Sequence, residues 1–116
     1  MLALEESLVQ SVGLPYRVVN TAAGDLSTAA AKRYDIEAWF PSQERYREIT
    51  SCSNTTDFQA RRSGIRYRTD EGRLATPHTL NGTAATDRWV LSILENFQGE
   101  VPASLQEYGA PPRVLK

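Results

Sequence analysis

Acidic side chains that could meet a charged ligand gather in two neighbouring extended segments of this sequence. Glu48 follows Arg47 and precedes Thr50, while Asp35 and Glu37 lie on the polar face of the segment before it. Carboxylates on one face of a sheet suit Mg²⁺, which often takes one or two of them together with substrate phosphates. A cross-strand ion pair between Glu48 and an arginine is the alternative, and the pattern alone favours it.

Residues 78–98 contain a second candidate site, at the start of an amphipathic segment. Short polar residues lead to Asn81-Gly82, which we interpret as a break, and apolar residues then recur at helical spacing with Arg88 in the first turn. The apolar residues are Val90, Leu94 and Phe97, with Trp89 and Ile93 beside them. A strand–turn–helix junction presents backbone N–H groups and a positive helix dipole to an anion such as phosphate. An ordinary surface helix with a solvated arginine is the alternative.

Other reactive side chains show no functional pattern. His78 has no companion His or Cys at ligand spacing, which favours an ordinary strand residue over a metal ligand. The single cysteine, Cys52, cannot form an internal disulfide, and we interpret it as a small buried residue. The pair Arg61-Arg62 ends a short expected helix, where the dipole favours cations for structural reasons. A Walker-type glycine loop, a GxGxxG motif and a Ser/His/Asp spacing are all missing.

The length and composition of the chain are those of one ordinary domain. The chain has 116 residues and a formal charge of −1, so it lacks the basic excess of a protein that binds RNA by itself. The lone cysteine indicates a reducing compartment. Because no apolar run approaches about 20 residues and no signal pattern opens the chain, we expect a soluble, cytoplasmic protein.

The N-terminal half of the chain predicts a helix followed by three strands. Residues 1–13 form the helix, which has one apolar face, and residues 16–20 form the first strand. Residues 21–31 read as a loop, with one possible helical turn over 29–33. From Asp35, apolar residues alternate with polar or aromatic ones, which predicts a second strand with one core face and one polar and aromatic face. Residues 45–54 form a third strand, which is expected to pair antiparallel with the second. The helix face is Leu4, Leu8 and Val12, the core face of the second strand is Ile36, Ala38 and Phe40, and Tyr46, Glu48, Thr50 and Cys52 share one face of the third.

The C-terminal half adds shorter elements. A short helix is expected to run through Arg62, with N-cap candidates at residues 53–57. A hairpin formed by 65–68 and 73–80 around an exposed loop at 70–72 follows, and then a tail with little periodicity over 101–116. Strands joined by tight turns, with helices at both ends and no regular β-α alternation, predict an α+β fold. Its core is an antiparallel β-sheet flanked by helices.

Three segments of the sequence resemble a known family in their order and spacing. They are LPYRVVNTAAGDL (14–26), AAKRYDIEAWFPSQERYREITSCSNTTDFQARR (30–62) and HTLNGTAATDRWVLSILENFQ (78–98). Together they are similar to the C-terminal part of the catalytic core of seryl-tRNA synthetases, which are class II aminoacyl-tRNA synthetases. The resemblance is collinear from about residue 3 to residue 112. It implies a partial class II catalytic fold that uses ATP and serine to make seryl-adenylate and then transfers the seryl group to tRNA(Ser).

The resemblance also implies roles for individual residues. Four consecutive positions correspond to the family's ATP-binding segment: Glu48, Ile49, Thr50 and Ser51. Within this segment Glu48 is the expected partner of Mg²⁺ and of phosphate, and thus a catalytic residue. Arg88 matches the arginine of the family's third motif, a second catalytic residue expected against ATP and its terminal phosphate. Asn81 and Thr83 fall at the serine-binding positions.

Residues 1–116 are therefore expected to be a C-terminal fragment of a class II catalytic domain, with the third motif at 78–98 and a tail at 101–116. The tRNA-binding arm, the first two motifs and the contacts of a homodimeric parent are expected to precede Met1, so the chain alone should be inactive. Two alternatives are a non-catalytic synthetase-like protein and an interaction module. The module would use exposed apolar residues, for which Leu4, Leu8, Trp39 and Phe40 are the candidates.

Overall fold

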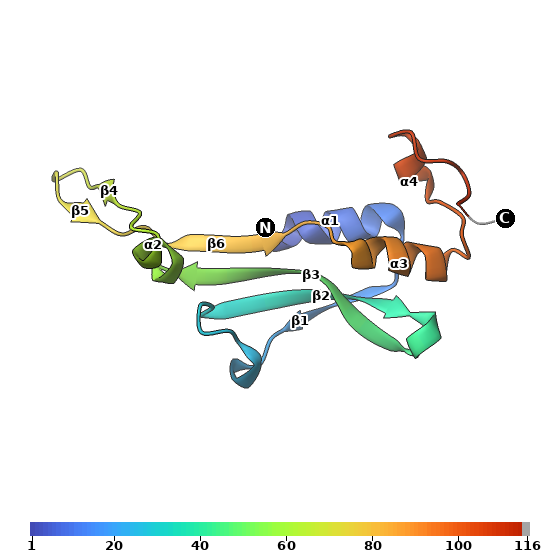
Figure 1. Cartoon of the computed structure of the whole chain (residues 1–116), viewed down its shortest axis with the longest axis horizontal. Helices are drawn as coiled ribbons and strands as arrows, with labels where there is room; N and C mark the ends of the chain where they lie inside the picture. The colour runs from blue at the N-terminus through green and yellow to red at the C-terminus, as the bar shows by residue number, and fades with distance from the viewer. Residues whose placement is uncertain (115–116) are drawn as a thin grey trace.

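The computed structural model describes residues 1–114 and shows one antiparallel sheet with helices packed on one of its faces (Figure 1). The sheet has the strand order β1-β2-β3-β6, so β1 and β6 are its edges. The elements are α1 (Leu2–Val12), β1 (Tyr16–Asn20), η1 (Ala23–Asp25), β2 (Lys32–Phe40), η2 (Pro41–Gln43), β3 (Arg45–Thr56), α2 (Phe58–Arg62), β4 (Tyr67–Arg68), β5 (Leu74–Ala75), β6 (Thr79–Thr83), α3 (Asp87–Asn96) and α4 (Ala103–Gln106). The predicted α+β class and the antiparallel pairing of the second and third strands are confirmed.

The core lies between the sheet and helices α1 and α3, which Figure 1 shows on the same side of it. The alternation in β2 sends Ile36, Ala38 and Phe40 into this core, as predicted. Phe40 is only 3% exposed, so the expectation that it belongs to an exposed interaction surface is wrong, and Trp39 on the opposite face is half-buried. We call the side that carries α1 and α3 the helix-covered face and the opposite side the open face.

The two main helices bury stripes that match the prediction only in part. Val12 of α1 is buried and Phe97 after α3 packs against the core, as predicted, but other positions differ. In α1 the buried residues are Glu5, Val9 and Val12, while Leu4 is 63% exposed and Leu8 37%. In α3 the buried residues are Trp89 and Ser92, while Val90 is exposed. Asn96 of the same stripe donates a hydrogen bond to the Trp39 carbonyl at 2.9 Å. Polar groups that find partners in the sheet therefore help to set the orientation of this helix.

Three smaller predictions also need correction. The turn expected over 29–33 is absent, because Lys32 and Arg33 already belong to β2, and the loop instead forms the short helix η1. The predicted hairpin is present but short, and Leu80 lies in β6 instead of the hairpin. The tail contains α4, whose Leu105 packs against the core.

The Arg61-Arg62 pair has a structural role. Arg61 pairs with Asp57 one turn earlier at 2.9 Å, and Arg62 lies over the Phe58 ring at 4.6 Å.

Within residues 1–114, no helix is both long enough and apolar enough to span a bilayer.

Candidate functional site

A β-bulge in β3 decides which side chains can form a site. Asp35 pairs with Ser51 and Ile36 with Thr50, but Glu37 pairs with Glu48, so Ile49 is an extra residue in β3. An extra residue reverses the alternation of side chains beyond it. Tyr46 and Glu48 therefore share the open face with Ser51.

The bulge overturns the prediction that Tyr46, Glu48, Thr50 and Cys52 lie on one face. Thr50 is 2% exposed and Cys52 8%, and both lie on the helix-covered face. Ile49 at the bulge is 1% exposed and belongs to the core. Of the four residues in the expected ATP-binding segment, Glu48 and Ser51 thus present their side chains to the open face. Ile49 and Thr50 could offer a ligand only their backbone.

β6 carries the two residues expected to bind serine onto the same face. Thr83 pairs with Ser51, and Asn81 pairs with Ser53, and both β6 residues are exposed. The Asn81-Gly82 dipeptide is not a turn, because β6 runs without interruption from Thr79 to Thr83 and the break follows at residues 84–86. The predicted strand–turn–helix order is thus present, with the turn a few residues later than expected.

The start of α3 is tied to the bulge by two side-chain hydrogen bonds. Thr86 Oγ1 donates to the Ile49 carbonyl at 2.9 Å, and Arg88 Nη1 donates to the Glu48 carbonyl at 2.9 Å. A bulge disrupts the ladder locally, and here its two carbonyl groups receive donors from residues about forty positions later in the chain. These bonds place the exposed Arg88 guanidinium beside Glu48.

An ion network on the open face holds the Glu48 carboxylate. Arg33 Nη2 lies 2.9 Å from Glu48 Oε1, and Arg33 Nε lies 2.6 Å from Asp35 Oδ1. Burial alone would lower the pKa of Arg33, but the hydrogen bonds and charges of Asp35 and Glu48 outweigh it and raise that pKa. The structure therefore contains the cross-strand ion pair that the pattern favoured for Glu48.

Three arginines and two glutamates surround a hollow of about 310 Å³ next to the bulge. Its lining is Glu37, Arg45, Tyr46, Arg47, Glu48 and Arg88. Guanidinium groups suit phosphate, which they can bind with two parallel hydrogen bonds. Sequence reasoning missed Arg45 and Arg47 as candidates, although their position next to Glu48 was a signal, and it missed Thr86 because nothing local indicates its distant partner.

Comparisons with known proteins show which proteins this chain is similar to. The serine–tRNA ligase of Clavibacter michiganensis is 52% identical over 121 residues, which cover 100% of this chain, and that of Leifsonia xyli is 54% identical over 113 residues. The seryl-tRNA synthetase of Pyrococcus horikoshii, whose crystal structure was determined in complex with ATP, superposes with a TM-score of 0.88 and 44% identity over 99% of this chain.

The matched region is a small part of these relatives. The chain spans 28% of the length of the Clavibacter michiganensis ligase and 28% of the Pyrococcus horikoshii structure. The family model of the tRNA synthetase class II core domain (G, H, P, S and T) matches residues 1–97. The antiparallel sheet and the match over most of its length show that this chain belongs to the class II tRNA synthetase core domain family.

Proposed function

We propose that this chain is the C-terminal part of the catalytic domain of a serine–tRNA ligase and supplies part of the surface on which ATP and serine react. The observation that carries this proposal is the bulge at Ile49, which sets Glu48 and Ser51 beside Asn81 and Thr83 on one open face. Its relatives named above are serine–tRNA ligases. Without the bulge, strand alternation would put Glu48 on the opposite face of the sheet from Ser51.

ATP fits the hollow at the Glu48 end of this face, which three arginines line. The Arg88 guanidinium stands beside Glu48, and Arg45 and Arg47 line the same hollow. A planar cation in this position can bind phosphate oxygens or stack on adenine. When the serine carboxylate attacks the α-phosphorus and pyrophosphate leaves, negative charge develops on phosphate oxygens, and a fixed guanidinium stabilises it.

Mg²⁺ could bind at the same end of the open face through a few oxygen ligands. The Glu48 carboxylate and the Ser51 hydroxyl share the open face, and no group of three His, Cys, Asp or Glu side chains among residues 1–114 is placed to hold a metal alone. Such a site suits Mg²⁺, which combines one or two carboxylates with nucleotide phosphates and water. When bound, the ion would neutralise phosphate charge. The Glu48 carboxylate forms an ion pair with Arg33, and this pair would have to weaken or break when Mg²⁺ binds.

Serine fits the β6 side of the face. Asn81 offers an amide and Thr83 a hydroxyl, and both are exposed beside the Ser51 and Ser53 positions of β3. Such neutral groups can hydrogen-bond the ammonium and hydroxyl groups of the amino acid. In this proposal the rest of the ligase supplies the remaining contacts to serine, tRNA(Ser) and a second subunit. The reaction would take place in the cytoplasm.

Exposed apolar residues give the rest of the ligase a surface to cover. Leu4, Leu8, Val90 and Leu91 are all exposed, and a groove of about 790 Å³ runs between α1, α3 and α4. Large apolar patches on a domain commonly mark an interface. We therefore assign this surface to contacts within the complete enzyme.

The proposal is tested by placing residues 1–116 in the Leifsonia xyli ligase instead of its matching segment. The expected result is exchange of pyrophosphate into ATP that depends on serine and does not occur with alanine or threonine, while the chain alone gives none. A hybrid that folds but shows no exchange, or exchange with all three amino acids, would contradict the proposal.

A further inference from the structure

A carboxyl group with no place in the proposed chemistry lies buried behind the sheet. Glu5 in α1 is 4% exposed, and its Oε2 has no hydrogen-bond partner within the described part of the chain. Burial raises the pKa of Glu5 above its ordinary value, and this outweighs the lowering by a hydrogen bond with Cys52 and by the N-terminal ammonium group. Such a group is costly to bury, so its position needs a reason.

Glu5 packs directly against the backbone of β6 at Gly82. A Cβ atom added to Gly82 would lie 2.9 Å from Glu5 Oε1 and 3.4 Å from Cys52 Cβ, and it would also meet Met1 Cε. Only glycine leaves room for the carboxyl group here. Gly82 pairs with Cys52 across the two strands, so Glu5 contacts both β6 and β3.

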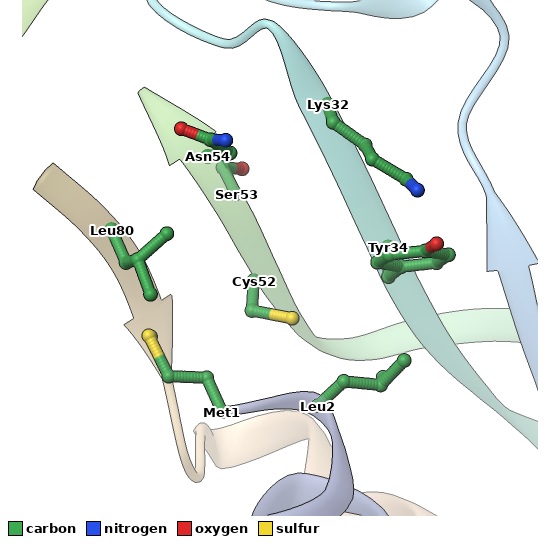
Figure 2. Close-up of a pocket in the computed structure, with 8 residues that line it drawn as sticks. All are labelled: Met1, Leu2, Lys32, Tyr34, Cys52, Ser53, Asn54 and Leu80. Atoms are coloured by element: carbon green, nitrogen blue, oxygen red, sulfur yellow. The ribbon is translucent and has the colours of Figure 1, made fainter. Parts of the chain in front are cut away.

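Figure 2 shows a pocket on the helix-covered face whose lining includes Met1 and Cys52, the two other residues near Gly82. The Met1 and Cys52 side chains and Leu80 of β6 point into one pocket of about 190 Å³. The pocket lies between the start of α1 and strands β2, β3 and β6. The Met1 side chain and the Glu5 carboxyl group both lie against the middle of β6 from behind.

The residues on either side of this contact are those of the open face. Strand alternation turns Asn81 and Thr83 away from Gly82, and it turns Ser51 and Ser53 away from Cys52. Glu5 thus lies back to back with the side chains assigned to serine. Glu48 and Arg88 lie elsewhere, farther along β3 and at the start of α3.

We propose that Glu5 is a positioning residue for the amino-acid half of the site. Wedged behind the Gly82–Cys52 pair, it fixes the spacing of β3 and β6 that Asn81 and Thr83 require. The inference rests on the proposed function where it assigns these side chains to serine. The contact between Glu5 and Gly82 stands independently of that assignment.

Two measurements on Glu5→Ala and Glu5→Gln test the inference. Glu6→Ala on the same helix is the control, because Glu6 accepts a hydrogen bond from Tyr16 of β1 and its loss should affect β1 instead of residues 81–83. In the 116-residue chain, Glu5→Ala should speed amide exchange at residues 81–83 by about tenfold and leave β1 unchanged, because the loss of support is local. In the hybrid ligase, the same change should raise the KM for serine about tenfold while the KM for ATP stays within about twofold. Glu5→Gln keeps the shape of the side chain and should behave like the unaltered protein in both assays.

Gly82→Ala is a second route to the same effect, because its methyl group would displace the Glu5 carboxyl group as well as the end of the Met1 side chain. It should raise the serine KM selectively, and its effect should shrink when Glu5→Ala is already present. Exchange at residues 81–83 that is unchanged in Glu5→Ala would overturn the inference, as would an equal rise of both KM values or faster exchange across the whole sheet. Local loss of protection together with an inactive unaltered hybrid would retain the positioning role and reject the proposed function.

Discussion

Removing a single hydroxyl group tests the link between the bulge and α3. Thr86→Val keeps the shape of the side chain but deletes the hydrogen bond to the Ile49 carbonyl, which is 2.9 Å long and partly buried. A hydrogen bond of this kind contributes about 1 kcal/mol, and the carbonyl left behind can still be reached in part by water. We therefore expect the free energy of unfolding to fall by about 1 kcal/mol, equivalent to about 4 °C in Tm for a chain of this size.

Urea and thermal unfolding of the 116-residue chain measure this effect. Thr28→Val is the matched control, because Thr28 is exposed in the turn before β2. It should change the free energy of unfolding by less than about 0.5 kcal/mol. Amide exchange adds a local readout: protection around the bulge should decrease in Thr86→Val, while protection in β1 should not.

The functional consequence of Thr86→Val is a looser Arg88, since both side chains hold the start of α3 against the bulge. In the hybrid ligase the KM for ATP should rise more than the KM for serine. Equal stability of Thr86→Val and Thr28→Val would refute the reasoning. So would a loss of stability without any local change at the bulge.

Three further changes probe the other parts of the site. Arg88→Ala in the hybrid ligase should lower kcat by a factor of about 10²–10³. Arg66→Ala on an exposed loop is the control and should leave kcat unchanged. A decrease in kcat of less than about threefold in Arg88→Ala would count against a role in charge stabilisation. Arg33→Met should tighten Mn²⁺ binding to the chain by about tenfold, because it removes the cation that pairs with Glu48; unchanged binding by electron paramagnetic resonance would contradict this. Because burial raises the pKa of Glu5, the folded state holds that proton more tightly, so stability should fall as pH rises from 4.5 through the raised pKa. Glu5→Gln should flatten this part of the pH profile of urea unfolding, and an unaltered profile would argue against the burial of the charge.

Alternation of apolar and polar residues was enough to predict part of the sheet. Ile36 and Ala38 are in the core as expected, and the strand that follows pairs antiparallel with β2. The face of Ser51 was not predictable in this way, because one extra residue at Ile49 reverses the pattern. Nothing local indicates the bulge, which depends on the register with β2 and on donors from Thr86 and Arg88.

Local turn chemistry was misleading at Asn81-Gly82 for a related reason. This dipeptide is a strong turn signal, but here it lies within a strand, and Gly82 makes room for Glu5 from a helix about 77 positions earlier. The helix faces were equally ambiguous. α1 has apolar residues on two sides, and the sheet buries the side that carries Val9 and leaves Leu4 exposed.

The resemblance added residue roles that pattern alone could not supply. Periodicity suggested an anion site near Arg88 and a carboxylate at Glu48 as separate features, and the structure brings the two residues together through a hydrogen bond from Arg88 to the Glu48 backbone carbonyl. Of the four residues that the resemblance assigns to ATP, only Glu48 and Ser51 have their side chains on the open face. The family assignment rests on the match over residues 1–97.

A crystal structure of the hybrid ligase with a non-hydrolysable seryl-adenylate analogue would test the central claim most directly. The account predicts that the phosphate lies against Arg88 and Glu48, and that the seryl group lies against Asn81 and Thr83 on the open face. An analogue bound on the helix-covered face, or on the open face without contact to these four residues, would contradict it.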